Sequence, residues 1–470
     1  MSPKSLVALE RDRAEEAAIV TSAATLPPHT PFHTRVLIMC LCTMSGVEFS
    51  TVLPSLWLYV QELSISGATL GLTPISVQLY AQVFFTIASM ATKLVVGPLA
   101  DRMRFRPLFA VCTAVPSIGG LLYGVARTAG GYRTLLAARL VMGVGGGMST
   151  VANAFTVRAA RDIGQRQQQL ATNAACTLVG VLVGPGIVPI FAAVQFSIAD
   201  FKVDERNLPG FFLFLVFAGL GALQPWLLVE PPPAAAAAAP AAAPDAATTA
   251  ASSQPPARPR WFLAASLGID LALASMFGCV MFSTTPVVTI ITEDRFGWGP
   301  IPNAFLFLGV ALFTLCGVLA TGSLLKAGTS PAPILLASAS LLLVHQLIVG
   351  FAEAAVFRTP SSFILWVGSV AISYACLNGS IAGQITRTVP AGNVGFYMGI
   401  TGVVDSAGQA SGPLILKLFG ADDGHLPLVI STSRLALAVP TTLLIALHAT
   451  RLLWVRAEEE RASSHAIAMV

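Results

Sequence analysis

The sequence predicts an all-α membrane protein with twelve transmembrane helices arranged as two six-helix repeats. The first observation is composition: 55% of the 470 residues are hydrophobic and 11% are charged, with a mean hydropathy of +0.75. Soluble domains carry about 25% charged residues. The second observation is the length of the apolar segments. The third is a set of glycine and proline positions in the first half of the chain that recurs in the second.

The apolar segments have the length that a bilayer requires. A helix that crosses the ~30 Å hydrocarbon core needs about 20 mostly apolar residues. Twelve segments meet this requirement: 36–61, 75–98, 108–127, 133–157, 168–194, 211–229, 261–291, 302–325, 331–352, 362–386, 394–419 and 428–454. The lipid bilayer is therefore the expected surroundings of the chain.

The connections between these segments indicate the topology, because Lys and Arg accumulate on the cytoplasmic side of membrane proteins. With a cytosolic amino terminus, most basic residues fall on that side. We therefore expect both termini in the cytosol, as tails of residues 1–35 and 455–470. The net charge of +4 follows from this bias and gives no indication of nucleic-acid binding. The basic residues on the other side are Arg127, Arg133, Lys202, Arg206, Arg295 and Arg358.

A segment rich in Pro, Ala and Ser at residues 230–260 divides the chain. Such a composition cannot bury enough apolar surface to pack a core. The sequence therefore predicts a flexible cytoplasmic linker between one bundle at residues 36–229 and another at 261–454.

Three weak internal repeats relate the two bundles, and their offsets are nearly the same. Six-helix repeats around a site at mid-membrane are typical of secondary transporters. The matched positions are Gly180, Gly184 and Pro185 with Gly408, Gly412 and Pro413, Gly97 and Leu99 with Gly322 and Leu324, and Pro54 and Glu62 with Pro286 and Glu293.

A charged turn, "GPLADRMRFRP", joins the second and third predicted spans and contains Gly97, Leu99, Asp101 and Arg102. It is similar to the Gly-x-Leu-Ala-Asp-Arg motif of the major facilitator superfamily, although Arg104 stands where that family has a second glycine. Three further stretches resemble family motifs of spans four, five and eleven, and their pattern is similar to the eukaryotic endolysosomal branch linked to ceroid lipofuscinosis. These stretches are "RLVMGVGGG", "GVLVGPGI" and "GFYMGITGVVDSAGQASGP".

The resemblance implies the major-facilitator fold and a gating role for this turn. In the family, the aspartate equivalent to Asp101 meets the amino end of span eleven and an arginine at the end of span four, here Arg158 or Arg161. A helix amino end carries partial positive charge, so a carboxylate there is stabilised by about 0.3–1 kcal/mol. The alternative is a solvated turn that sets topology only, and for Arg102 alone this alternative is preferred.

The glycines of spans four, five and eleven allow helices to approach closely. They serve either the rocking of the two bundles or plain packing. The residues concerned are Gly143, Gly147, Gly180, Gly184 and Pro185, with Gly408, Gly412 and Pro413 in the second half.

Charges within the spans are candidates for function, since a charge at the bilayer centre costs at least about 2.5–3.5 kcal/mol. Glu48, Asp405 and Asp270 lie deep in spans one, eleven and seven. A carboxylate in a cavity can exchange protons, and we rank them in that order as proton-coupling groups; the alternative for Glu48 is a structural ion pair. Arg139 is expected to bind an anionic substrate or to pair with Glu48. Lys93, Lys417 and Arg434 lie nearer the surfaces, where topology or packing explains them at least as well as function.

These features predict a secondary active transporter that moves a small solute or ion by alternating access, coupled to protons as a symporter or antiporter. The alternatives are an anion-conducting channel of the same fold and a transport-inactive sensor or scaffold. The chain has no catalytic constellation, and its seven cysteines fall within spans, so we expect no enzyme activity, no cofactor and no metal site. A lysosomal or vacuolar membrane is favoured over the plasma membrane.

Overall fold

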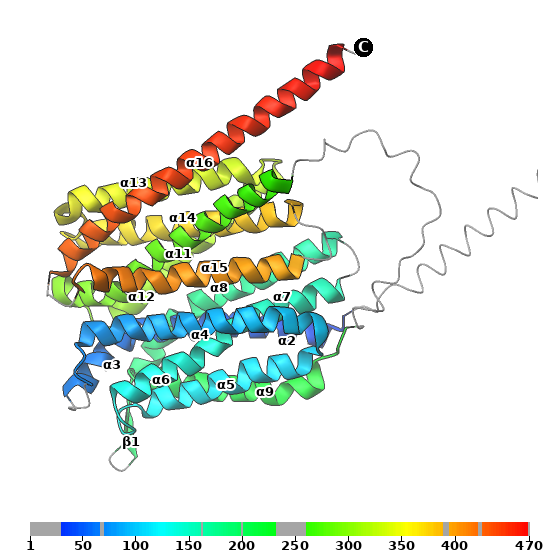
Figure 1. The fold of residues 1–470 in the computed structure, drawn as a ribbon. Helices are drawn as coiled ribbons and strands as arrows, with labels where there is room; N and C mark the ends of the chain where they lie inside the picture. Colours follow the sequence, from blue (N-terminus) through cyan, green and yellow to red (C-terminus); the bar gives the residue numbers. More distant parts are fainter. Residues whose placement is uncertain are drawn as a thin grey trace, which may run out of the picture.

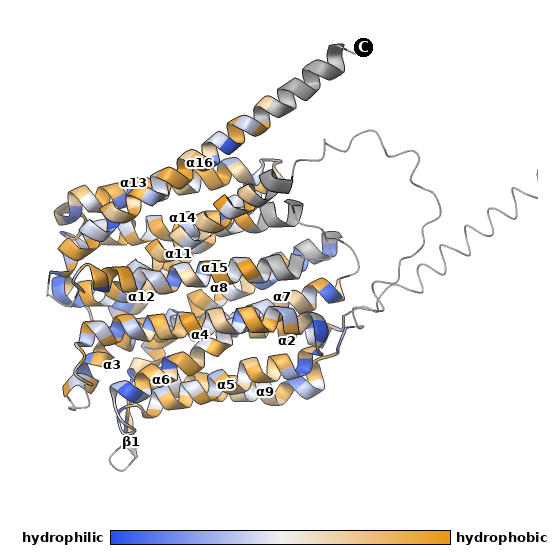
Figure 2. Cartoon of the chain, viewed as in Figure 1, coloured by the Kyte–Doolittle hydropathy of each residue, from blue (hydrophilic) through white to orange (hydrophobic). Residues whose placement is uncertain are grey.

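The structure is a computed structural model that describes residues 30–65, 70–160, 163–198, 201–231, 260–388, 394–421 and 425–468. These residues form a bundle of long, roughly aligned helices (Figure 1). Apolar residues run along the helices, and hydrophilic residues gather toward their ends (Figure 2). The predicted helical fold is confirmed, with a short β-hairpin in addition.

The first half of the bundle, called the N-half below, runs from α2 to α9. A β-hairpin lies between α8 and α9, with Phe196 paired to Val203. The elements are α2 (Phe32–Ser50), α3 (Leu53–Ile65), α4 (Pro74–Arg102), α5 (Phe105–Val125), α6 (Tyr132–Met142), the 3₁₀ segment η1 (Gly143–Gly147), α7 (Met148–Ala159), α8 (Ile163–Ala193), β1 (Phe196–Ile198), β2 (Phe201–Val203) and α9 (Leu208–Leu227).

The second half, called the C-half, contains one helix for each of its six predicted spans. They are α11 (Arg260–Phe296), α12 (Pro300–Lys326), α13 (Pro331–Val356), α14 (Pro360–Thr388), α15 (Val394–Leu418) and α16 (Leu426–Ala468). The end of the bundle with β1 and β2 is called the hairpin side. The opposite end, where α9 ends and α11 begins, is called the linker side (Figure 1).

Two predicted spans are interrupted. The first is broken between α2 and α3, which are bent by 42°. The fourth contains η1, whose sequence Gly-Val-Gly-Gly-Gly disfavours a regular α-helix. Boundaries also move: α2 begins at Phe32, inside the predicted tail, and α16 continues to Ala468, beyond the predicted end at residue 454.

The count of membrane-crossing helices depends on α15. Among the described residues, ten helices are long and apolar enough to cross a bilayer, and the bent α2–α3 pair makes eleven. The helix α15 is not among them. It packs against α11 and α4 and carries Asp405, Gln409 and Lys417. A helix that faces other helices needs fewer large apolar residues than one that faces lipid, so α15 completes the predicted twelve.

The predicted repeat appears as equivalent glycine contacts in the two halves. A Cβ atom at Gly180 of α8 would overlap the Thr43 carbonyl of α2, and one at Gly408 of α15 would overlap the Ser275 carbonyl of α11. A second pair of contacts lies about two turns farther along α2 and α11: Gly184 meets the Thr51 backbone nitrogen, and Gly412 meets the Ser283 backbone nitrogen. Thr43 and Ser275 are as far apart in the sequence as Thr51 and Ser283, so α8 packs on α2 in the same way as α15 packs on α11.

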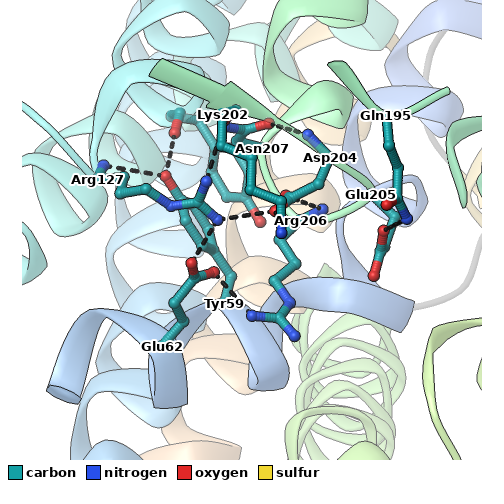
Figure 3. A network of polar contacts seen from close by, with 10 residues as sticks. Tyr59, Glu62, Arg127, Gln195, Lys202, Asp204, Glu205, Arg206 and Asn207 are labelled. Atoms are coloured by element: carbon teal, nitrogen blue, oxygen red, sulfur yellow. Dashed lines mark hydrogen bonds and ion pairs between the residues drawn. The ribbon is translucent and has the colours of Figure 1, made fainter. Parts of the chain in front are cut away.

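A cluster of charged side chains holds the β-hairpin to the N-half (Figure 3). The Arg127 guanidinium lies 2.5 Å from Glu62 Oε1 and 2.9 Å from Asp204 Oδ2, and Arg206 lies 2.9 Å from Glu62 Oε2. Burial raises the pKa of Asp204, but hydrogen bonds from Arg127 and the Arg206 N–H, together with the Arg127 and Lys202 charges, outweigh burial and bring the pKa below its usual value. Arg127 and Arg206 are thus neutralised by carboxylates close to them in space.

Candidate functional site

Four hydrogen bonds between described residues cross the interface between the N-half and the C-half. Trp57 Nε1 donates to Glu293, and Lys417 Nζ donates to Ser76 Oγ. Gln78 Nε2 donates to the Pro286 carbonyl at 3.2 Å. These three bonds lie toward the hairpin side, where α3 ends and α4 begins. The fourth, from Lys93 Nζ to Ser406 Oγ at 2.9 Å, lies deeper along α4.

Asp405 lies next to this fourth bond, in a small polar cluster formed by Tyr374 and Gln409 of the C-half and Lys93 of the N-half. The Tyr374 hydroxyl donates to its carboxylate at 3.2 Å, and Gln409 Nε2 donates to it at 2.7 Å. The Lys93 ammonium interacts electrostatically with Asp405 but is not within ion-pair distance. Asp405, Lys93, Tyr374 and Gln409 are all partly exposed. The cluster therefore places two opposite charges across the interface, each hydrogen-bonded to neutral groups.

The absence of a side chain at Gly402 positions Lys93 against α15. A Cβ atom at Gly402 would lie 3.4 Å from Lys93 Cδ. Gly402 and Ser406 are one turn apart on the same face of α15. The aliphatic part of Lys93 thus passes over the glycine, and its ammonium reaches the serine.

A cavity of about 50 Å³ lies between the halves. The Asp405 cluster lies about one helical turn farther along α14, because Val370, which lines the cavity, and Tyr374 are four residues apart on one face of that helix. The cavity is on the hairpin side of Tyr374. Its lining comprises Phe49, Ser50, Leu53, Val181 and Pro185 of the N-half and Met281, Thr284, Thr285, Val288, Phe307, Val310, Ala311, Thr314, Val367 and Val370 of the C-half.

Glu48 and Arg139 lie together inside the N-half. Glu48 is 1% exposed and Arg139 is fully buried. The Glu48 carboxylate packs against Gly145 of η1, where a Cβ atom would overlap it, and neither of its oxygens has a hydrogen-bond partner. Arg139 Nη2 lies 3.4 Å from Gln82 Oε1, and its guanidinium lies 4.5 Å from the centre of the Phe85 ring. The two charges interact electrostatically, and these contacts come from the N-half alone.

Asp270, the third carboxylate candidate, has a partner within the C-half. Its Oδ1 lies 2.9 Å from Arg451 Nη1 and 3.6 Å from His448 Nδ1, both on α16. Arg434, also on α16, is fully buried and donates to the Val280 carbonyl at 3.0 Å.

Lys93 and Lys417, for which topology or packing is expected to be at least as good an explanation as function, both lie at the interface between the halves. Both side chains cross the interface and donate to serines of the opposite half. Lys417 also lies 4.9 Å from the centre of the Tyr80 ring of α4.

The charged turn lies at the linker side. Gly97, Leu99 and Arg102 are in the last turns of α4. Arg158 Nη2 donates to the Ala100 carbonyl, and its guanidinium lies 4.6 Å from the centre of the Phe105 ring. The structure thus brings Arg158 to the end of α4 that contains Asp101. The side chain of Asp101, and Arg161 as a whole, lie outside the described residues.

The glycines of η1 make contacts that exclude larger residues. A Cβ atom at Gly143 would overlap the Phe85 carbonyl, and one at Gly147 would overlap the Thr92 side chain, both on α4. Pro185 and Pro413 lie inside α8 and α15, directly after Gly184 and Gly412.

Glu230, expected as the first residue of the linker, is bound to the N-half. Its carboxylate accepts hydrogen bonds from the backbone N–H groups of Phe105 at 3.0 Å and Arg106 at 2.7 Å, the start of α5. Arg106 in turn donates to the Leu228 carbonyl at 2.9 Å. A carboxylate at a helix amino end satisfies N–H groups that have no partner within the helix.

Sequence reasoning missed the partners of Asp405. Gln409 carries a signal, since it lies four residues after Asp405 on the same helix face. Tyr374 and Ser406 carry none, because a tyrosine or serine in an apolar span is ordinary packing material. Only the folded chain brings Lys93 to them.

The family model described as Major Facilitator Superfamily matches residues 38–413. No curated protein sequence matches the chain.

Solved structures share the fold. The human organic anion transporter MFSD10 (TETRAN) is 16% identical with a TM-score of 0.62, and the alignment covers 88% of this chain and 99% of that one. A bacterial homologue of the human lysosomal transporter Spinster, inward-facing and unoccupied, is 12% identical with a TM-score of 0.62, over 90% of this chain and 98% of that one. Its inward-facing, occupied form is 13% identical with a TM-score of 0.58, over 90% and 96% of the two chains.

Proposed function

The chain belongs to the major facilitator superfamily, and from this premise we propose that it is a secondary active transporter that moves a small solute by alternating access, with proton coupling at Asp405. The family and the similar solved structures support a membrane transporter rather than an enzyme. The two bundles, residues 36–229 and 261–454, are the bodies that move in this proposal.

The observation that carries the proposal is the placement of Lys93 and Asp405 on opposite halves. A ligand or proton shifts a conformational equilibrium only if it interacts differently with the two states. Rocking of the halves changes the separation of these two charges. Protonation of Asp405 removes their attraction, so it changes the relative free energies of the two states.

The same reasoning ranks Glu48 behind Asp405. The groups found around Glu48 belong to the N-half, and a rigid-body movement of that half leaves them in place. Protonation of Glu48 then acts equally on both states. Glu48 remains the alternative coupling group if the N-half itself deforms at η1.

Rocking also requires contacts that break and form. The bonds from Trp57 to Glu293 and from Lys417 to Ser76 join the halves on the hairpin side, and both must separate for that side to open. We propose that Asp101, with Arg158 beside it, then holds the linker side closed. The distribution of Lys and Arg supports a cytosolic linker side, with both termini there.

The proposed location is an endolysosomal membrane. The motifs of spans four, five and eleven support it, and one similar solved structure is a bacterial homologue of a human lysosomal transporter.

Double electron–electron resonance, which measures the distance between two spin labels, tests the proposed function. Ile65 of α3 and Asp294 of α11 are exposed on the hairpin side of opposite halves. Cysteines at these two positions, in a background without the native cysteines, carry the labels in liposomes. In the wild type we expect two distance populations whose ratio changes between neutral and acidic pH. Asp405→Asn should abolish this change, and Glu48→Gln should retain it.

Two outcomes would overturn the proposal. A single distance under all conditions excludes alternating access on this interface, and a pH shift that persists in Asp405→Asn places the coupling elsewhere. Recordings in planar bilayers separate the channel alternative, which requires large unitary currents. A sensor or scaffold that folds correctly gives neither large unitary currents nor solute turnover that saturates with substrate.

A further inference from the structure

We propose that the substrate is an amphipathic organic anion: its apolar body enters the cavity between the halves, and its anionic group binds the Lys93 ammonium when Asp405 is protonated. This inference rests on the proposed function, because it uses the same charge pair, and it adds the chemical class of the solute.

The cavity wall offers few free hydrogen-bond donors to a ligand. Most of its residues are apolar, and its serine and threonine hydroxyl groups already donate to backbone carbonyls of their own helices. Ser50 donates to the Gly46 carbonyl at 3.0 Å, Thr285 to the Met281 carbonyl at 3.0 Å and Thr314 to the Val310 carbonyl at 2.9 Å. A polar group placed here would lose its hydration without gaining these donors, at a cost of roughly 1–3 kcal/mol.

The size of the cavity sets a limit on what this conformation holds. About 50 Å³ has room for a short aliphatic end of a molecule, whereas a dry cavity that binds benzene measures ~150 Å³. The wall is shared by both halves, with Phe49 on one side and Met281 and Val288 on the other. Separation of the halves therefore enlarges it, and a longer apolar body then becomes possible.

Lys93 is the cation best placed to bind a ligand among the described residues of the interface. Arg139 is fully buried within the N-half. Arg434 is fully buried within the C-half and donates to Thr284 of the cavity wall from behind it, so its guanidinium is already engaged. Lys417 contacts Ser76 and the Tyr80 ring on the hairpin side. Lys93 is partly exposed and donates to the neutral Ser406. An ammonium has three donors, so it can hold an anion in addition to this serine.

Tyr374 connects the two parts of the site. It donates to Asp405, and the same face of α14 continues through Val370 and Val367 into the cavity. A molecule with a charged end at Lys93 therefore has its apolar end directed along α14 into the apolar wall.

The charges predict a linkage between the anion and a proton. With Asp405 ionised, a bound anion would place two negative charges around one ammonium. With Asp405 protonated, the anion meets Lys93 alone. Binding of the anion is therefore accompanied by uptake of one proton from solution onto the Asp405 carboxylate, and it strengthens as the pH falls. A monoanion and a proton then move together without net charge.

Three probes with the same apolar body test this class: phenylbutyrate, phenylbutanol and phenylbutylamine. Binding of each to the purified full-length protein is measured by calorimetry at neutral and acidic pH. We expect phenylbutyrate to bind the wild type about tenfold more tightly than the other two, and more tightly at acidic pH. Lys93→Met should lose the preference for phenylbutyrate and retain binding of phenylbutanol. Asp405→Asn should bind phenylbutyrate independently of pH.

Matched variants keep the test specific. Val370→Phe fills the cavity and should weaken all three probes, whereas Lys417→Met removes a cation outside the site and should keep the preference. Circular dichroism and size-exclusion chromatography check the fold of each variant. A preference for the amine, a preference for phenylbutyrate that survives Lys93→Met, or no binding of phenylbutyrate would overturn the inference. The proposed function fails separately, by loss of the pH-dependent distance shift in the wild type.

Discussion

Lys93 of α4 and Asp405 of α15 face each other across the interface without forming an ion pair, and each is held by neutral hydrogen-bond partners. An arrangement of this kind keeps both charges available. A close ion pair would bind them to each other and would have to be broken for every new contact.

The first prediction concerns the coupling of this pair. Lys93→Met and Asp405→Asn each leave one charge without its counterpart, and each should lower the thermal stability of the purified protein. The double variant should lose less than the sum of the two, with a coupling free energy of about 0.5–3 kcal/mol. Thermal unfolding followed by tryptophan fluorescence measures the cycle. Strict additivity would show that the two charges do not interact.

The second prediction concerns Glu48 and Arg139. Both side chains are buried and interact electrostatically, so removing one of them leaves the charge of the other uncompensated inside the N-half. Glu48→Gln should therefore reduce expression and thermal stability, and adding Arg139→Gln should partly restore both. A Glu48→Gln protein that folds normally but loses the pH-dependent distance shift would instead make Glu48 the coupling group.

The overall fold is predictable from the sequence because a bilayer imposes a minimum length on every span and because contact glycines recur in both halves. The sequence shows Gly180 and Gly408 as a repeat, and the structure gives them equivalent contacts with α2 and α11. The site was less predictable. Asp405 stood out as a charge in an apolar span, but Lys93 and Ser406 are 313 residues apart, and no local pattern relates them.

Glu48 shows a different limit of sequence reasoning. The sequence places Glu48 deep in span one, but depth does not tell whether a helix face points to the space between the halves or into one half. That direction is decided by the packing of α2 against Gly145 of η1.

The third prediction uses the contact glycines. Gly180→Ala and Gly408→Ala place a methyl group against a backbone carbonyl, which cannot move without shifting a helix, so each should destabilise the fold by about 1–3 kcal/mol. Gly309 and Gly219 are matched controls, since nothing lies within 4 Å of a Cβ atom there. Alanine at the controls should be neutral or stabilising. Equal effects at all four positions would remove close packing as the reason for these glycines.

The fourth prediction is a pH dependence on the hairpin side. The folded pKa of Asp204 lies below its ordinary value of 3.8. Its ionised form therefore stabilises the fold above pH 3.8, and this contribution is lost as the pH falls through the folded pKa. Asp204→Asn should lower thermal stability at neutral pH by about 1.5–3 kcal/mol. The gap to the wild type should close in acid. Glu205→Gln, on the same connection, is the control; a gap that stays constant with pH would contradict the assignment.

The fifth prediction concerns the charged turn. Asp101→Asn should insert normally but reduce the population that is open on the hairpin side, because the linker side is then held closed less well. The labelled Ile65–Asp294 pair reports that population. Arg102→Gln, an exposed neighbour, should leave it unchanged. A wild-type population in Asp101→Asn would reduce this turn to a signal for topology.

The contacts of Glu230 set the C-terminal boundary of the N-half as a folded unit. The last helical residue of α9 is Leu227, yet the carboxylate three residues later completes the amino end of α5. A gene divided to produce the two halves as separate polypeptides should therefore be cut after Glu230. A division at the end of the helix would leave the first amide groups of α5 without their acceptor, and a fragment shortened in this way would misrepresent the half it was made to isolate.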